Sequence, residues 1–119
     1  MWQQVVVVGR TGRSAELRYT PSGIAVVGFS VAANRRWSDK EGENHEKTVW
    51  FKVAAWGEKW TWLENALNGS RLVMVVGELE EPDVWEDASG KGPRASNSLR
   101  MQTIRMLESD NKQGTMFSE

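Results

Sequence analysis

The chain of 119 residues contains no cysteine, one histidine, one tyrosine and three prolines. Without cysteine it can form neither a disulfide nor a thiolate-ligated metal site. No apolar run approaches the ~18 residues of a membrane-spanning helix, and the first residues lack the basic and then apolar order of a signal peptide. We therefore expect a cytoplasmic protein that acts away from membranes.

The net charge of −1 argues against a polycation that coats nucleic acid indiscriminately. The charge is unevenly placed, however: residues 1–60 hold nine Lys/Arg against six Asp/Glu, and residues 61–119 hold six against ten. A fold can gather the cations of the first half on one face, and phosphate binding depends on such a local patch. The length fits one domain, which we place at residues 1–108, followed by a short polar, disordered tail at 109–119.

Tryptophan is abundant, with seven copies in the chain. Three of them lie near positive charge: Arg35 and Arg36 precede Trp37, and Lys52 lies between Trp50 and Trp56. A tryptophan taken alone is more often a core residue. A flat apolar ring beside a cation is, however, what an unpaired base stacks on while its phosphate is neutralised. As a set, these residues favour nucleic-acid binding.

Strand patterns dominate the chain. Short alternating or β-branched runs predict strands at residues 3–9, 16–19, 24–33, 48–56, 71–79 and 97–107. An amphipathic helix is predicted over residues 58–68, with Gly69 placed to cap its end. Residues 38–47 are expected to form a polar loop, and residues 80–93 an extended hairpin. The predicted fold is all-β with one helix, a five-stranded Greek-key barrel of the OB-fold type.

Alternation also assigns faces within two of these strands. Over residues 48–56, Val49, Phe51, Val53 and Ala55 point to the barrel interior, while Trp50, Lys52 and Trp56 point outward. Over residues 97–107, we expect Leu99, Met101, Thr103 and Arg105 to share one face. Tyr19 and Phe29 are expected to pack inside the barrel and Trp60 on the core face of the helix. Trp62, off that face, is expected to be exposed or at a subunit contact, and Trp2 to cover a barrel end or an interface.

Several segments together resemble the bacterial single-stranded DNA-binding protein (SSB) family. They are Val5 to Gly9, Leu17 to Gly23, Phe29 to Trp37, Thr48 to Val53, Trp56-Gly57, Asn68 to Ser70, Val75 to Leu79 and Trp85 to Asp87. They lie in the family's order and cover roughly residues 4–107. The Arg-Tyr-Thr-Pro-Ser-Gly and Asn-Arg-Arg-Trp pieces, followed by a Trp-x-Lys-Val strand, make the combination specific.

The resemblance implies an OB-fold that assembles as a homotetramer and binds single-stranded DNA without sequence preference during replication, recombination and repair. The family's stacking aromatics fall on Trp37, Trp50, Trp56 and Trp85, where Trp56 replaces a usual Phe. Its backbone-contacting cations fall on Lys52, Arg36 and Arg10, and Arg35 beside Trp37 is a further candidate. Such a protein is not an enzyme and needs no cofactor or metal. A bacterial, phage or plasmid origin and a nucleoid association would fit.

Three departures from the family pattern matter. The family often has a basic residue directly after the Trp56-Gly57 equivalent, whereas Glu58 stands there in this chain and Lys59 follows. The family's segment before the last stacking tryptophan is strongly basic, whereas residues 79–85 are acidic here, which weakens the role of Trp85. The family usually ends in a long linker and an acidic tip that recruits replication and repair enzymes. No such tip is evident at residues 110–119, so the chain is either truncated or does not recruit partners in that way.

Three other interpretations stay open. The chain could be an SSB-like accessory factor of primosome assembly or recombination that acts mainly through protein contacts. It could be a small enzyme, although it has no Gly-rich phosphate cradle, metal-ligand spacing or nucleophile–base pair. His45, in the charged loop, has no Cys or second His nearby and is expected to be solvated. Finally, the exposed tryptophans could serve a protein interface.

Overall fold

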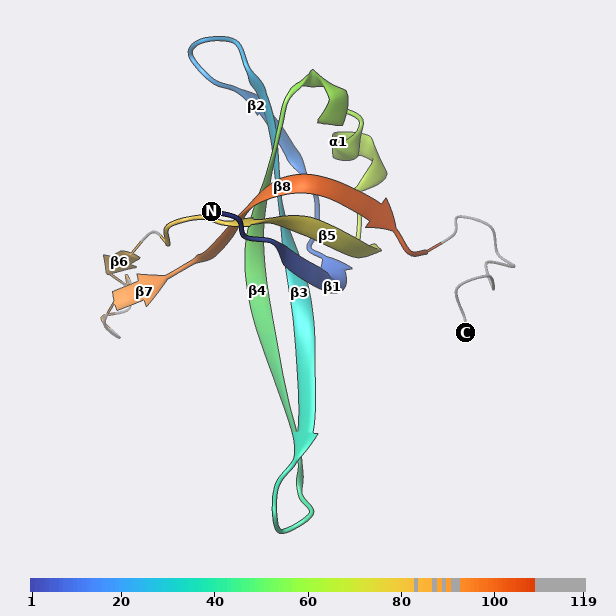
Figure 1. Cartoon of the computed structure of the whole chain (residues 1–119), viewed down its shortest axis with the longest axis vertical. Coiled ribbons are helices and arrows are strands. Elements are labelled where there is room, and N and C mark those ends of the chain that lie inside the picture. Colours follow the sequence, from blue (N-terminus) through green and yellow to red (C-terminus); the bar gives the residue numbers. More distant parts are fainter. Residues whose placement is uncertain (83, 87, 89, 91–92, 109–119) are drawn as a thin grey trace.

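Five strands close into a barrel in the computed structural model, which describes residues 1–82, 84–86, 88, 90 and 93–108. They are β1 (Val5–Thr11), β3 (Ala25–Ser38), β4 (Asn44–Trp56), β5 (Leu72–Leu79) and β8 (Asn97–Met106). The order around the barrel is β1-β5-β8-β4-β3, closed by β1 pairing with β3, while β2 (Glu16–Tyr19) extends β3. A separate hairpin of β6 (Val84–Glu86) and β7 (Pro93–Ala95) projects from the barrel (Figure 1). The predicted all-β barrel and the hairpin are confirmed.

Every second residue along the barrel strands points inward, and these side chains fill the barrel interior. Strand β3 buries every second residue from Ala25 to Val31, and β4 buries Val53 and Ala55. Among the largest fully buried side chains are Leu99 and several β-branched valines. Each such side chain contributes roughly 1.5–3 kcal/mol through burial, so the alternation seen in the sequence is what closes the barrel and turns the other face outward.

Two glycines let the strands of the barrel approach closely. A Cβ atom at Gly9 of β1 would overlap the carbonyl oxygen of Ala32 on β3, and one at Gly77 of β5 would overlap the carbonyl oxygen of Arg100 on β8. Backbone atoms cannot move aside as a flexible side chain can, so a larger residue at either position must push the strands apart.

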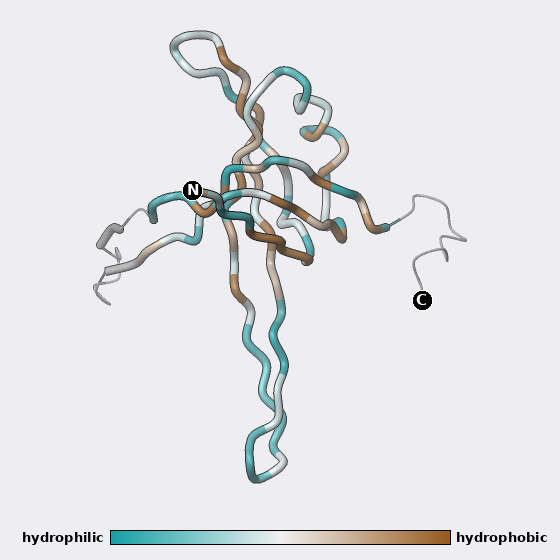
Figure 2. The backbone as a smooth tube through the Cα atoms, viewed as in Figure 1, coloured by the Kyte–Doolittle hydropathy of each residue, from teal (hydrophilic) through white to brown (hydrophobic). Residues whose placement is uncertain are grey.

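Strands β3 and β4 continue far beyond the barrel as a two-stranded arm, which is hydrophilic at its far end (Figures 1 and 2). The predicted polar loop at residues 38–47 is therefore wrong in extent, because only residues 39–43 connect the strands. Cross-strand polar contacts replace apolar packing here: Ser38 bonds Asn44 at 2.8 Å and Thr48 bonds Asn34 at 2.8 Å. Polar strands in such a pair carry little hydrophobic signal in the sequence.

The helical segment after β4 is shorter and more broken than predicted. It consists of a 3₁₀ turn, η1 (Glu58–Trp60), and a single α-helical turn, α1 (Leu63–Ala66). The Thr61 hydroxyl donates to the Glu58 carbonyl oxygen at 3.1 Å, and the Thr61 backbone N–H bonds the same carbonyl in an i to i+3 pattern. Gly69 was predicted to cap the helix end, but the C-cap is Leu67. Gly69, at φ 91°, lies two residues further on, and its backbone N–H donates to the Arg13 carbonyl oxygen at 2.9 Å. Among the described residues no helix is long and apolar enough to cross a membrane.

The last strand changes face in its middle. Leu99 and Met101 are buried as predicted, but Thr103 and the arginine two residues later are exposed. The pairing with β5 shifts register between Val76 and Gly77, so that Gln102 is an extra residue in β8. Such a bulge reverses the inward and outward positions beyond it, which is why the single-face prediction for residues 99–105 is wrong.

The aromatic residues outside the candidate interface are mostly placed as expected. Phe29 is buried and Trp60 packs against the core, while Trp62 is half exposed. Tyr19 was expected inside the barrel but is 58% exposed, because it ends the short strand that lies outside the barrel ring. Trp2 is almost fully exposed, so it does not cover a barrel end within this chain.

Candidate nucleic-acid interface

The outward face of β3 and β4 carries the predicted binding residues over a floor of small side chains. The register places Trp50 opposite Ala32 and Lys52 opposite Ser30, and the next outward pair of the ladder is Ala54 with a glycine. Small partners cannot cover the ring of Trp50 or the stem of Lys52. The strand pattern therefore builds a shallow surface from which one ring and one cation project.

Trp50 is the most exposed aromatic residue on this surface, at 54%. It lines a groove of about 490 Å³ together with Lys47, Lys52 and Asn97. The side-chain amide of Asn97 donates to the Trp50 carbonyl oxygen at 3.2 Å, which ties the backbone of β4 to the start of β8. A ring beside two lysines in an open groove can stack on a base while the phosphates are neutralised.

Trp56 lies on the same face but is partly buried, and its ring is partly covered. The guanidinium carbon of Arg100 lies 5.0 Å from the ring centroid, within the range of a cation–π contact. The Trp56 indole nitrogen is buried and has no hydrogen-bond partner among the described residues. A base that stacks on this face must therefore meet Arg100 as well as the ring.

Arg100 is the residue that reasoning from the sequence missed. It lies on β8 between buried Leu99 and Met101, so the alternation of the strand turns it outward, and it pairs with Ala54 of β4 in the parallel ladder. The position of this cation beside Trp56 depends on which strands are neighbours, and the sequence does not show that β8 lies next to β4.

The tip of the arm forms a second cluster around Trp37, which is 43% exposed. The ring of Trp37 stacks on that of His45 at a centroid distance of 5.4 Å and an interplanar angle of 22°. The guanidinium carbon of Arg35 lies 5.5 Å from the Trp37 ring. Arg36 pairs with Glu46 at 3.3 Å across the ladder, so one predicted phosphate partner already has a carboxylate beside it.

His45 is tied to the turn of the arm by a bond of 2.8 Å between its Nε2 atom and a carboxylate oxygen of Asp39. This hydrogen bond, followed by the backbone N–H of Glu43, holds the pKa of Asp39 below its ordinary value of 3.8. Asp39, Glu43 and His45 offer three ligand-type atoms within 4.8 Å of one another. Because His45 and two backbone N–H groups already occupy the Asp39 carboxylate, we do not assign a metal to this cluster.

Two predicted site residues lie elsewhere. Arg10 forms an ion pair with Glu108 at 2.8 Å, at the end of the barrel that the segment before β5 covers. The backbone of Trp85 pairs with Arg94 in the β6–β7 hairpin, but the side chain of Trp85 is outside what the structure describes. The structure thus brings Trp50, Lys52 and Trp56 together and places the Trp37 cluster farther out on the same arm. The roles of all eight residues stay predictions.

Acidic residues border the surface on its β5 side. Glu80 and Glu81 line a hollow of about 540 Å³ that also includes Lys52 and Ser98. The Glu80 backbone N–H donates to the Ser98 carbonyl oxygen at 2.7 Å, which fixes this segment against β8. The same hollow includes Ser30 and Ala54, so these carboxylates place negative charge next to Lys52 on the outward face of β3 and β4.

Comparison with known proteins gives one consistent result. Residues 2–107 match the profile of the Single-strand binding protein family. The chain is 35% identical over 112 residues to Single-stranded DNA-binding protein 1 of Synechocystis sp., covering 92% of this chain and 88% of that protein. It is 28% identical over 109 residues to the Single-stranded DNA-binding protein of Helicobacter hepaticus, covering 92% of this chain and 63% of the relative.

Solved structures show the same barrel. A deletion mutant of the single-stranded DNA-binding protein from Thermus aquaticus matches with a TM-score of 0.69 at 26% identity, covering 90% of this chain and 51% of that one. The Plasmodium falciparum SSB complex with ssDNA matches with a TM-score of 0.67 at 23% identity, covering 88% and 92%. This second likeness supports the OB-fold alone. The chain spans about half of the Thermus aquaticus protein.

Proposed function

The chain belongs to the single-strand binding protein family, and on that basis we propose that it binds single-stranded DNA without reading its sequence. The observation that carries the proposal is the outward face of β4 and β8, where Trp50, Lys52, Trp56 and Arg100 lie together. Each base has a π-face, so stacking accepts any sequence. Bases in a duplex are already stacked on each other, which gives the preference for single strands.

The division of labour follows from the exposure of each side chain. Trp50, the more open ring, stacks on a base, and Lys52 two residues on neutralises the adjacent phosphate. The guanidinium of Arg100 lies over the ring of Trp56, so this pair binds one nucleotide as a unit. The arm extends the surface to Trp37. The chain acts in this way as a binding protein rather than as an enzyme, in replication, recombination and repair in the cytoplasm.

An oligomer, which we propose to be a homotetramer, fits the exposed side of β1. Val6 and Val8 are more than half exposed on this strand. Strand β1 pairs with β3 only at Arg10 and Thr11 among the described residues, and Gly9 lies against the backbone of β3. Its edge from Val5 to Val8 is therefore available to a second chain. An open, apolar strand edge is a template for pairing, and closed symmetry would bury it.

A role mainly through protein contacts, as in an accessory factor of primosome assembly, is not favoured. That interpretation leaves the outward tryptophans of β4 without a ligand. The acidic pair Glu80 and Glu81 shares a hollow with Lys52, Ser30 and Ala54 of the surface, and it leaves Trp50 and its groove uncovered.

Fluorescence anisotropy of labelled oligo-dT, with a duplex of equal length as competitor, tests the proposal. We expect binding to oligo-dT that duplex does not displace and that weakens as salt rises, since cations on the protein release counterions. Replacing Arg100 by Gln should reduce the slope of log affinity against log salt by about 0.7, the value for one phosphate contact on a single strand. Arg105→Gln, on the same strand beyond the bulge, removes the same charge and serves as the matched control. Equal binding of duplex and oligo-dT would contradict the proposal.

A further inference from the structure

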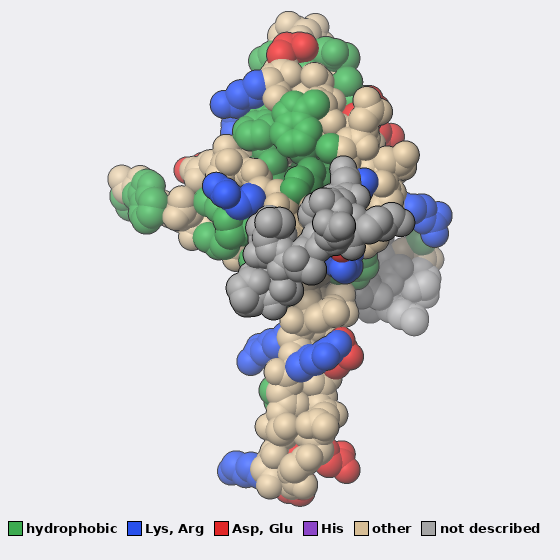
Figure 3. All heavy atoms as spheres, turned by 90° about the vertical axis from the view of Figure 1, so that its right-hand side faces the viewer, with side chains coloured by type: hydrophobic (Ala, Val, Ile, Leu, Met, Phe, Trp, Pro, Cys, Tyr) green, Lys and Arg blue, Asp and Glu red, His purple; other side chains and the backbone are tan. Residues whose placement is uncertain are grey.

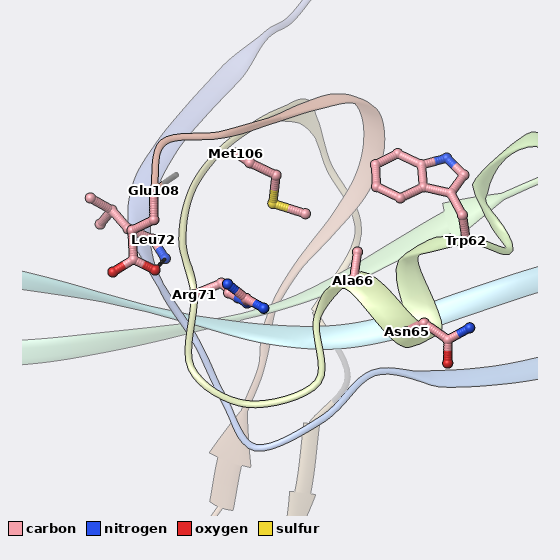
Figure 4. Close-up of a pocket in the computed structure, with 7 residues that line it drawn as sticks. All are labelled: Trp62, Asn65, Ala66, Arg71, Leu72, Met106 and Glu108. Carbon is pink, nitrogen blue, oxygen red and sulfur yellow. Dashed lines mark hydrogen bonds between the residues drawn. The ribbon is translucent and has the colours of Figure 1, made fainter. Parts of the chain in front are cut away.

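A cleft of about 480 Å³ lies apart from the interface, between the helical segment and the ends of β5 and β8. Its apolar wall includes Trp62, Ala66 and Met106, with Arg71 in the middle and Glu108 at the far side (Figure 4). Hydrophobic side chains gather on this side of the barrel (Figure 3). The proposed function uses none of these residues.

Trp62 is the exposed aromatic of the cleft, at 49%. Its ring contacts that of Trp60 at a centroid distance of 6.3 Å and an angle of 43°. Trp60 in turn packs against the barrel core and has the ammonium nitrogen of Lys59 at 5.4 Å from its ring. Trp62 is thus held by a neighbour anchored in the core while part of its surface stays open to solvent.

The other side of the cleft holds a carboxylate in an anion-binding arrangement. One oxygen of Glu108 accepts from the Arg10 guanidinium at 2.8 Å, and the other accepts from the Leu72 backbone N–H at 3.1 Å. Arg71 lines the same cleft as this carboxylate (Figure 4). The hydrogen bond from Arg10, followed by that from the Leu72 backbone N–H, holds the pKa of Glu108 below its ordinary value, and the charge of Arg71 adds to this in the same direction. Guanidinium groups and backbone N–H donors are also what a phosphate binds.

We propose that this cleft is a second nucleotide-binding subsite for single-stranded DNA. Trp62 stacks on a base, and Arg10 with Arg71 binds the phosphate whose place the Glu108 carboxylate takes in the DNA-free chain. The inference rests on the proposed function. The sequence predicts that Arg10 contacts the DNA backbone. In this inference Arg10 does so at the cleft rather than beside Trp50, and the Glu108 carboxylate competes with the phosphate for it.

Charge and shape favour nucleic acid over an acidic peptide as the occupant. The cleft combines a half-exposed indole with the guanidinium of Arg71, and Arg10 binds the lining carboxylate of Glu108 from outside the cleft. The β4 surface likewise places a ring, Trp50, in a groove with cations. The arm of β3 and β4 extends the proposed binding surface beyond the barrel (Figure 1). A DNA strand that contacts more than one surface of the chain is consistent with this shape. An OB-fold contacts about 4–16 nucleotides depending on the protein. A test of the second subsite therefore needs an oligonucleotide long enough to reach both the β4 surface and the cleft.

The test compares short and long oligo-dT, of about 8 and about 30 nucleotides, around that range. Trp62→Ala should weaken binding of the long strand by about 5-fold or more, the lower end for loss of one stacked base, and leave the short strand unchanged. Glu108→Gln should strengthen binding of the long strand by about 1.4- to 5-fold at low salt, the range set by an exposed ion pair. Glu64→Gln, on the exposed side of α1 and outside the cleft, removes the same charge and should have a smaller effect at both lengths.

The outcomes separate the two claims. If the unaltered chain binds neither oligonucleotide, the proposed function fails. If it binds both, but Trp62→Ala and Glu108→Gln match it at both lengths, only the second subsite is overturned. A melting temperature for each variant guards against loss of folding, and Trp62→Ala leaves the Arg10–Glu108 pair intact. An acidic peptide could instead bind at Arg71 without displacing oligo-dT. If it does so, and Trp62→Ala does not change binding of the long strand, the cleft is a protein-binding site and the inference is overturned.

Discussion

Replacing Trp50 by alanine should weaken DNA binding far more than it weakens the fold. The ring is 54% exposed and lies over small residues of β3, so its removal leaves no closed cavity. Truncating a fully buried large aromatic costs about 3–5 kcal/mol, and less than half of this ring is buried, so we expect a loss below about 2 kcal/mol of unfolding free energy. Loss of a stacked base costs about 1–3 kcal/mol, which is roughly a 5- to 150-fold loss of affinity.

Anisotropy of labelled oligo-dT gives the affinity, and urea unfolding gives the stability. Trp50→Phe keeps a stacking face and should recover most of the affinity. Trp60→Ala is the matched contrast, because that ring packs against the core; it should lose more stability than Trp50→Ala. The reasoning is refuted if Trp50→Ala binds oligo-dT as the unaltered chain does, or if it loses as much stability as Trp60→Ala.

The remaining predictions concern charge, assembly, pH and packing. Lys52→Gln should lower the salt slope of oligo-dT binding by about 0.7; an unchanged slope would remove it from the phosphate contacts. Val8→Lys should shift the chain toward single copies of 13.4 kDa in sedimentation, and an unaltered assembly would place the interface elsewhere. His45→Ala should raise the pKa of Asp39 toward 3.8 in NMR titration. Because the folded pKa lies below the unfolded value, this stabilisation is present above pH 3.8 and is lost as the pH falls through the folded pKa; a fixed Asp39 pKa would contradict the bond. Gly77→Ala should cost about 1–3 kcal/mol in thermal unfolding through backbone overlap, and an unchanged melting temperature would show that the strands adjust.

Gly28 offers a control for the packing prediction. A Cβ atom there would lie 4.0 Å from the Val53 carbonyl oxygen, an ordinary contact. Gly28→Ala should therefore change the melting temperature little. A loss equal to that of Gly77→Ala would mean that glycine is needed in these strands for a reason other than close approach.

The barrel and much of its outer face could be predicted because alternation is a local property of the chain. Val53 and Ala55 of β4 are buried while Trp50 and Lys52 are exposed, as the spacing in the sequence indicates. The ends of the elements were harder. The arm continues through polar pairs that carry no apolar signal, and the helical segment breaks at Thr61, whose hydroxyl bonds the backbone.

Features that depend on non-local pairing could not be predicted. The bulge at Gln102 reverses the faces of β8 and follows only from the pairing with β5. Arg100 meets Trp56 because β8 lies beside β4, and Arg10 meets Glu108 although 98 positions separate them in the chain. The alternation of polar and apolar residues along a strand predicts that such charged residues are exposed, but it does not predict which residue on another strand they contact.

The most direct test of single-strand stacking is the intrinsic tryptophan fluorescence of the chain during titration with oligo-dT at low and high salt, with duplex DNA as the control. We predict strong quenching by oligo-dT, weaker at high salt and absent with duplex, and a smaller quench in Trp50→Ala. Binding to oligo-dT without quenching, or equal quenching by duplex, would contradict stacking of the outward tryptophans on unpaired bases.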